Sequence, residues 1–348
     1  MKERIVWLDY GKAIAIYLVV LAHTALYKPA EGFIYTFHMP FFFFMSGYLF
    51  SYGKYPSYMA FAKRRFRQLI VPYVVINMIA YLLWLLVLRN VGSDAGEDMG
   101  TFSPLVAAVT VNAPKMVHNV PLWFLAALFM VENLYYLLYR NARYRVVVTT
   151  LLLLLAVLNN TYNTVRLPFC IDISLVALLF YRLGNMMREK GEMIFRWYLF
   201  VLSLVATAVV FMMNGKVAMH ANYYNNILLF VVGGVAGCYS MAYICRLLQS
   251  LFGDLMFIQV IAKNTLPICA FHLIAFALIK GVMLYLFGLS SEILTGTFLP
   301  NALFALLSIV MCLLVAKMLN RFVPFVLGKI DSPAKSCVCL SKKFSQPE

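Results

Sequence analysis

Long apolar runs alternate with short polar segments over all 348 residues of the chain. A helix that spans a membrane needs about 20 predominantly apolar residues, and ten runs approach this length once their flanks are included. The predicted spans are Ala13–Leu26, Phe33–Phe50, Leu69–Leu88, Leu122–Tyr139, Val146–Leu158, Ile171–Met187, Ile194–Met213, Ile227–Cys245, Leu266–Phe287 and Asn301–Leu319. The pattern therefore predicts an all-α, polytopic integral membrane protein with about ten transmembrane helices.

The polar segments between these runs are too short for a sizeable soluble domain. We expect a single transmembrane domain over residues 1–330, followed by a short polar cytoplasmic tail over residues 331–348. No small-residue cleavage site follows the first run, so we expect it to stay as a helix and not to be removed as a signal peptide. Any chemistry must then lie within the bilayer or directly beside it.

Composition agrees with this class, because 63% of the residues are hydrophobic, 12% are charged and the mean hydropathy is +0.83. Soluble domains are about half apolar and about one-quarter charged. The values exclude a disordered chain, a secreted disulfide scaffold and an ordinary cytosolic enzyme. The seven cysteines show neither the spacing of a zinc site nor that of a disulfide framework, and we expect no metal.

The net charge of +15 follows the predicted topology. The basic residues lie in loops between apolar runs and not on one face of a folded domain, so we expect contact with membrane lipid and none with nucleic acid. With a cytoplasmic N-terminus, the loops on that side hold most of the Lys and Arg residues, as the positive-inside rule requires. Ten spans then place both termini in the cytoplasm.

Ionisable side chains in hydrocarbon are costly, so those at the first span are candidate functional groups. Asp9 and Lys12 precede this span, and His23 lies eleven residues after Lys12. Eleven residues make about three helical turns, so Lys12 and His23 share one face and lie about 16 Å apart along the axis. His23 is then deep in the membrane, where a neutral imidazole can act as a general base. A histidine that only hydrogen-bonds between packed helices fits the same position.

The second span combines His38 with residues that disturb regular helix packing. Pro40 interrupts the backbone hydrogen bonding, and Ser46-Gly47 permits close helix approach. His38 therefore lies beside irregular backbone, either at a cavity or as a packing residue.

Two later spans carry further titratable candidates, Glu132 and His272, which the sequence does not place near His23. We expect Asp172 and Arg182, both at the sixth span, to form a structural ion pair across helices.

A basic cluster, defined as Lys63, Arg64, Arg65 and Arg67, precedes the third span. Arginine binds phosphate through forked donors, so the three arginines are candidates for holding a nucleotide-bearing donor. An anchor to anionic lipid explains the cluster as well.

Taken in order, these motifs resemble the membrane-bound acyltransferase 3 family. Lys12-x10-His23 is similar to its (Arg or Lys)-x10-His signature, and Arg64-x-x-Arg67 is similar to its R-x-x-R signature. Further stretches that resemble the family are Leu8-Asp9, Phe37 to Tyr48, Pro121 to Leu125, Leu183 to Asn185 and Lys263 to His272. The whole pattern is most similar to the fucose 4-O-acetylase-like subgroup.

The resemblance implies a protein of the bacterial inner membrane that moves an acyl group, usually acetyl, from cytoplasmic acyl-CoA to a hydroxyl of a cell-envelope glycan or lipid-linked sugar. Arg64, Arg65 and Arg67 then hold the phosphates of acetyl-CoA, and Lys12 adds a cation at the mouth of the site. His23 is the expected general base, with a transient acyl-histidine as the alternative. The other catalytic candidates are Asp9, Lys12, His38, Glu132 and His272.

Two other classes of function fit parts of the pattern. A transporter of a small solute would suit ten helices with buried polar residues, but transporters often contain repeats, and none is detectable in this sequence. A non-catalytic subunit of an envelope assembly would use His23 only for packing. Consumption of acetyl-CoA that depends on Arg64 and Arg67 would favour the acyltransferase.

Overall fold

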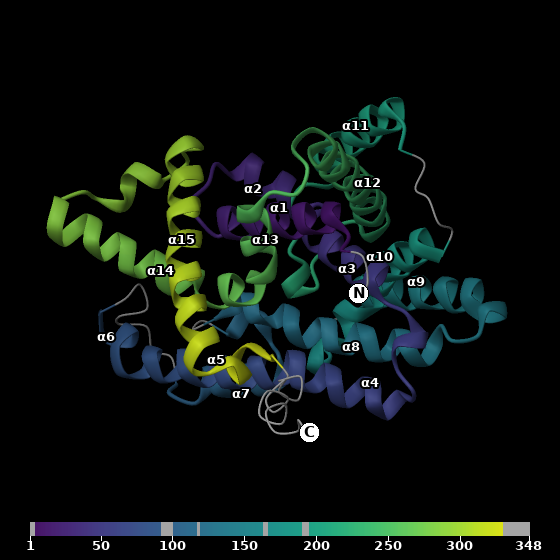
Figure 1. The fold of residues 1–348 in the computed structure, drawn as a ribbon, viewed down its shortest axis with the longest axis horizontal. Helices are drawn as coiled ribbons and strands as arrows, with labels where there is room; N and C mark the ends of the chain where they lie inside the picture. Colours follow the sequence, from purple (N-terminus) through teal and green to yellow (C-terminus); the bar gives the residue numbers. More distant parts are fainter. Residues whose placement is uncertain (1–3, 92–99, 117–118, 163–165, 190–194, 330–348) are drawn as a thin grey trace, which may run out of the picture.

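The computed structural model describes residues 4–91, 100–116, 119–162, 166–189 and 195–329 (Figure 1). Within these ranges the chain forms helices and two isolated β-bridges, without a longer strand. The prediction of an all-α protein is therefore confirmed. The predicted tail over residues 331–348 lies outside the described residues.

Eight helical segments of the described chain are long and apolar enough to cross a membrane. One segment joins α4 (Tyr58–Arg65), a π-helical turn (Phe66–Ile70) and α5 (Val71–Leu83). The other seven are α8 (Trp123–Leu138), α9 (Arg145–Tyr162), α10 (Ile171–Glu189), α11 (Trp197–Asn214), α12 (Ile227–Phe252), α14 (Thr265–Phe287) and α15 (Leu299–Phe322). They correspond to the third to tenth predicted spans. The multi-pass membrane class is confirmed, whereas the count of ten is not.

The first two predicted spans differ from the observed helices. The first is α1 (Val6–Ala22), which has 17 residues. The second is divided into α2 (Lys28–Tyr35) and α3 (His38–Leu49), with non-helical backbone at Phe37. Pro40 explains the division, because it has no N–H to continue a helix through this point, whereas in the first turn of a new helix that N–H is not needed. One continuous second span was therefore a wrong expectation.

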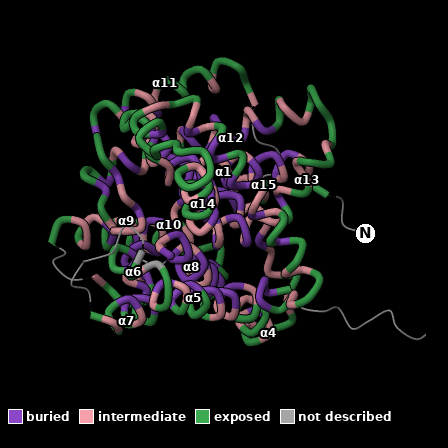
Figure 2. The backbone as a smooth tube through the Cα atoms, turned by 90° about the vertical axis from the view of Figure 1, so that its left-hand side faces the viewer, coloured by how far each residue is buried: buried purple, intermediate pink, exposed green. Residues whose placement is uncertain are grey.

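Although α1 is short, it lies in the interior of the helix bundle. It packs against α3, α12, α14 and α15, and against the short helix α13 (Met256–Lys263). Its buried residues Leu8, Tyr10 and Val20 point in different directions around the helix axis, as expected for a helix surrounded by protein. Figure 2 shows the contrast between the largely buried α8 and α10 and the largely exposed α11. Protein, and not lipid, therefore surrounds α1.

Helices α3 and α10 touch backbone to backbone through two glycines. A Cβ atom on Gly47 would lie 1.9 Å from the Tyr181 carbonyl oxygen, and one on Gly184 would lie 1.9 Å from the Phe44 carbonyl oxygen. Asn185 reinforces the contact, because its Nδ2 donates to the Gly47 carbonyl at 3.4 Å. The close approach predicted at Ser46-Gly47 is confirmed, and it fixes the position of α3 in the bundle.

The ion pairs of α10 are not those expected. Asp172 accepts a hydrogen bond from Arg166 at 2.6 Å, and Arg182 pairs with Glu189 at 3.1 Å. Asp172 and Arg182 are ten residues apart on one continuous helix, which separates them by about 15 Å along its axis. The predicted pair between them is therefore wrong, and each residue finds a local partner.

Candidate active site

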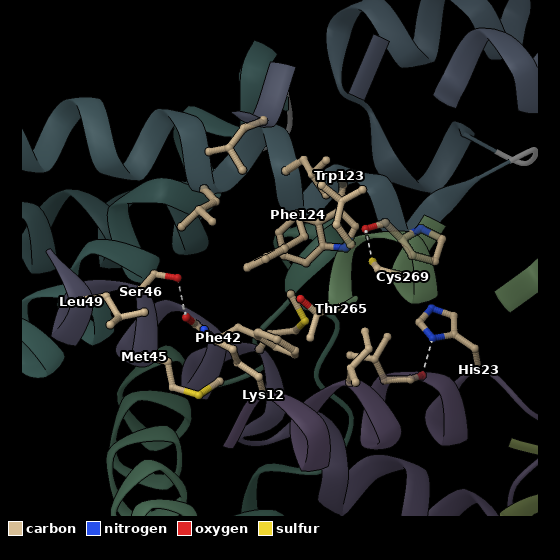
Figure 3. A pocket seen from close by; sticks show the side chains of 18 residues that line it. Lys12, His23, Phe42, Met45, Ser46, Leu49, Trp123, Phe124, Thr265 and Cys269 are labelled. Carbon is tan, nitrogen blue, oxygen red and sulfur yellow. Dashed lines mark hydrogen bonds between the residues drawn. The ribbon is translucent and has the colours of Figure 1, made fainter. Parts of the chain in front are cut away.

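A cavity of about 190 Å³ lies between α1, α3, α8 and the start of α14 (Figure 3). Most of its wall is apolar. The face of α1 that borders it presents Lys12, Ile16, Val19 and His23, at spacings of four, three and four residues. This spacing places side chains on one helix face, so the structure brings Lys12 and His23 to a common cavity as the sequence predicted.

The opposite wall is held together by hydrogen bonds between α14 and the turn that precedes α8. The Cys269 thiol donates to the Pro121 carbonyl at 3.7 Å (Figure 3). One residue farther along α14, the Ala270 carbonyl accepts a hydrogen bond of 3.0 Å from Asn119 Nδ2. Pro121 and Cys269 both line the cavity, so these contacts set its width at the level of His23.

His23 lies directly after the last residue of α1 and exposes one ring nitrogen. Its Nδ1 is 2.7 Å from the Val19 carbonyl oxygen. A carbonyl oxygen only accepts hydrogen bonds, so Nδ1 carries the hydrogen and Nε2 holds a lone pair. No residue in the described part of the chain hydrogen-bonds to this Nε2. His23 therefore offers an unprotonated nitrogen at the cavity wall, which is what a general base or a nucleophile needs.

His272 lies next to His23, a contact that the sequence did not predict. The two imidazole rings are 5.0 Å apart between centroids and meet edge to face. His272 is fully buried, and its Nδ1 lies 3.1 Å from the Ile268 carbonyl oxygen. It does not line the cavity, so it lies behind His23 as seen from the cavity.

His38 has a different environment. Its ring stacks on Tyr35 at 5.2 Å, and its Nδ1 lies 2.8 Å from the Ile34 carbonyl oxygen. The side chain is buried but does not line the cavity. The structure therefore places His38 in helix packing near the site.

His220 lies in the turn Met219–Ala221 between α11 and α12, and His23 contributes to its electrostatic environment, which sequence reasoning missed. Burial lowers the pKa of His220 to about 4, and repulsion from His23, Arg166 and Lys216 contributes. His220 lies in a loop, and no local sequence signal indicated which charges surround it. Among the described residues no group of three or more His, Cys, Asp or Glu could hold a metal ion.

Asp9 lies at the other end of α1 from His23 and outside the cavity wall. It accepts a hydrogen bond from Arg4 at 2.6 Å, and Arg4 also pairs with Asp254 at 2.9 Å. The hydroxyl of Tyr10 donates to the Gly253 carbonyl at 3.0 Å. These contacts tie the start of α1 to the turn between α12 and α13.

Glu132 and Arg65 form a buried ion pair between α8 and the end of α4. Both carboxylate oxygens of Glu132 accept hydrogen bonds from Arg65, whose third nitrogen donates to Gln68 at 2.8 Å. The exposed fractions of the two side chains are 21% for Arg65 and 4% for Glu132. All three guanidinium nitrogens of Arg65 therefore donate within the protein. Both carboxylate oxygens of Glu132 are likewise occupied by Arg65.

The remaining arginines of the basic cluster are exposed. Arg64 lies over the ring of Tyr55 at 5.8 Å, and Arg67 lies in the π-helical turn that follows α4. Leu69, two residues after Arg67, lines the cavity. Helices of this wider kind occur often at functional sites, and here the turn contains both the exposed Arg67 and the cavity residue Leu69.

Comparison with known proteins adds one positive finding. The chain matches the model of the acyltransferase 3 family, described as an acyltransferase domain, over residues 5–320. The matched range includes the whole cavity wall and the basic cluster. No curated protein and no solved structure matches the chain.

Proposed function

We propose that this chain, which belongs to the acyltransferase 3 family, transfers acetyl from cytoplasmic acetyl-CoA. Family membership and multiple membrane-spanning helices make it a membrane acyltransferase. The proposed acceptor is a hydroxyl of a cell-envelope glycan or lipid-linked sugar, and the proposed location is the bacterial inner membrane. The observation that carries the proposal is the free Nε2 of His23 at a cavity that also reaches Lys12 and Leu69.

The donor would enter beside the basic cluster. Arg64 and Arg67 are exposed and can bind its phosphates through forked donors. Arg65 was a candidate for the same role, but its guanidinium is bound to Glu132 and Gln68. We therefore assign the phosphates to Arg64 and Arg67, with Arg65 holding the turn in place.

Lys12 supplies a further cation at the mouth of the cavity. It lies on α1 and therefore on a different helix from the arginines that would hold the phosphates. The pantetheine arm of CoA is comparable in length to the axial distance of about 16 Å from Lys12 to His23. An arm laid along this face of α1 would bring the thioester to His23. The apolar walls would exclude water and so limit hydrolysis of the thioester.

The transfer itself then needs one base. His23 Nε2 takes the proton of the acceptor hydroxyl while the oxygen attacks the thioester carbonyl carbon. The carbon–sulfur bond breaks, and the CoA thiolate takes the proton back from His23. The products are the O-acetylated acceptor and free CoA, and His23 returns to its starting form.

The test measures the O-acetyl content of envelope glycans by NMR in a deletion strain restored with wild type or His23→Ala. Loss of a general base lowers a rate by about 10²- to 10⁴-fold, so His23→Ala should leave the signals near those of the deletion strain. Thr24→Ala is the matched control, because Thr24 is the next residue, bonds to the Leu21 carbonyl and does not line the cavity.

Membrane levels of the two variants should equal that of the wild type. Full restoration by His23→Ala would contradict the role of His23. If deletion leaves the O-acetyl signals unchanged, the glycan acceptor is wrong, and uptake of small solutes would then be measured.

A further inference from the structure

His272 contains a buried nitrogen without a hydrogen-bond partner. The residue is fully buried, its Nδ1 bonds to the Ile268 carbonyl, and its Nε2 meets no partner among the described residues. Since the carbonyl fixes the hydrogen on Nδ1, the unpartnered Nε2 carries a free lone pair. Buried polar atoms are normally hydrogen-bonded, and each exception in a folded protein calls for an explanation.

The surroundings of His272 suggest what the lone pair is for. One neighbour is the ring of His23, at 5.0 Å, and another is the ring of Phe276, at 5.5 Å. The Phe276 ring packs in turn on Phe304 at 4.9 Å. His272 is therefore held between apolar rings on one side and, on another, the imidazole that lines the cavity.

We propose that His272 is a positioning residue that stabilises the positive charge on His23 during acyl transfer. The inference rests on the proposed function. When His23 takes the hydroxyl proton, its ring becomes an imidazolium, and the neutral, polar ring of His272 lies 5.0 Å from it between centroids. A preorganised dipole in apolar surroundings stabilises a developing charge without further reorganisation.

The proton count stays balanced in this scheme. The O–H bond of the acceptor breaks as an N–H bond forms at His23 Nε2, and the hydroxyl oxygen forms a bond to the acyl carbon. The carbon–sulfur bond breaks, and the thiolate sulfur takes the proton from His23. His272 keeps one hydrogen, on Nδ1, throughout, because two adjacent imidazoles in an apolar site do not both become charged.

Two substitutions separate the lone pair from the shape of the ring. His272→Phe keeps an aromatic ring of similar outline but has no lone pair, whereas His272→Gln keeps an acceptor oxygen. Phe276→Leu is the matched control, because Phe276 lies one helical turn farther along α14 and also packs on the His272 ring. Each protein would be purified and placed in nanodiscs made from the membrane lipids of its host, and envelope glycans of the host would be added, so that both proposed kinds of acceptor are present.

The measurement follows the release of CoA thiol from acetyl-CoA and gives kcat and KM, alongside the melting temperature. His272→Phe should lower kcat about 10- to 100-fold, less than loss of the base itself, with KM for acetyl-CoA unchanged. His272→Gln should recover most of that loss, and Phe276→Leu should resemble wild type. The melting temperature of His272→Phe should equal or exceed that of wild type, since the substitution removes an unpartnered buried nitrogen.

Unchanged kcat in His272→Phe would overturn the inference. A fall in kcat that accompanies a fall in melting temperature, without recovery in His272→Gln, would overturn it too and would make His272 a structural residue. If His23→Ala abolishes thiol release in the same nanodiscs, the proposed function holds even when either result overturns the role of His272. Wild type that releases no thiol overturns the proposed function, and the role of His272 fails with it.

Discussion

At the residue scale, three histidines share one local arrangement and differ in what lies beyond it. In His23, His38 and His272, Nδ1 bonds to the carbonyl four residues earlier. This bond satisfies one nitrogen within the chain itself, and the environment of Nε2 then decides the role of each residue. Only the Nε2 of His23 belongs to a residue of the cavity wall in the described structure. A histidine in a predicted span therefore does not indicate a catalytic role until the surroundings of its second nitrogen are known.

Substitutions of Arg65 and Arg67 in the basic cluster should differ in their effects on KM and on stability. Arg67→Ala removes an exposed cation, so it should raise KM for acetyl-CoA with little change in stability. Arg65→Ala leaves Glu132 as an unpaired buried charge, and breaking such a pair costs about 3–5 kcal/mol. Thiol-release kinetics and thermal unfolding of both variants in the same nanodiscs would measure the difference.

An equal rise in KM for both variants, with both fully stable, would show that Arg65 also binds phosphate. Glu132→Gln adds a control, because it keeps the shape of the pair but removes the negative charge. It should be less stable than wild type and retain its KM.

His220 should make stability depend on acid pH. Its pKa is about 4 in the folded protein because of burial and of the nearby His23, Arg166 and Lys216, against about 6.5 in an unfolded chain. Between pH 6.5 and 4, His220 is therefore protonated in the unfolded chain but stays neutral in the folded protein. The free energy of unfolding falls as the pH drops towards 4. Melting temperatures of wild type and His220→Gln between pH 4 and 7 should converge at the upper end, with the steeper loss in wild type.

At the element scale, the site depends on how α3 is held. Helix α3 contributes Phe42, Met45 and Ser46 to the cavity wall, and its other side rests on α10 through the two glycine contacts. Arg188 adds to this attachment by donating to the carbonyls at the end of α3, including that of Phe50 at 3.0 Å. A shift of α3 would therefore change the cavity directly.

Gly184→Ala should disrupt this contact. The new Cβ would lie 1.9 Å from the Phe44 carbonyl oxygen, so the helices must separate, and overpacking of a close-packed interior typically costs about 1–3 kcal/mol or more. We expect a lower melting temperature and lower transferase activity. Gly281→Ala is the matched control, because a Cβ on Gly281, within α14, has nothing within 4 Å.

The control substitution should be neutral or slightly stabilising, since alanine favours a helix over glycine by up to about 1 kcal/mol. Equal stability of Gly184→Ala and wild type would show that α3 and α10 are not in fixed contact in the membrane.

At the scale of the whole molecule, the helices form one site from separate parts of the chain. His23, Ser46, Phe124 and Cys269 border the same cavity (Figure 3). Outer helices such as α9 and α11 are largely exposed, because only 11% and 22% of their most apolar stretches are buried. This suits lipid-facing helices around a centre that is surrounded by protein. The charge pattern of the loops then sets the orientation of this bundle in the membrane.

Orientation can be checked by labelling single cysteines with a membrane-impermeant maleimide. Both chosen positions are exposed. The positive-inside pattern places Ser57 in the cytoplasm and Glu292 outside, so Glu292→Cys should be labelled in intact cells and Ser57→Cys only after the membrane is opened. The unmutated chain gives the background. Labelling of Ser57→Cys in intact cells would reverse the topology and move the donor site to the wrong side.

Local periodicity was sufficient to predict the later helices and the register of Lys12 and His23. Apolar run length identifies a span, and the helical repeat places residues eleven positions apart on one face, so both conclusions need only neighbouring residues. The close approach at Gly47 could be anticipated as well, because a missing side chain is visible in the sequence. Its partner across the interface, Gly184, could not.

The contacts that define the site required the tertiary structure. His272 meets His23, and Glu132 meets Arg65, across long separations in the chain, and helical periodicity carries no information about which helix packs beside which. Pro40 predicted irregular backbone beside His38, which Phe37 confirms, but not the division into two helices. A proline can kink a span or begin a new helix, and packing selects between the two. Residue type and spacing therefore identified the chemistry that this chain can perform, whereas helix packing decided which of the candidate side chains meet at one cavity.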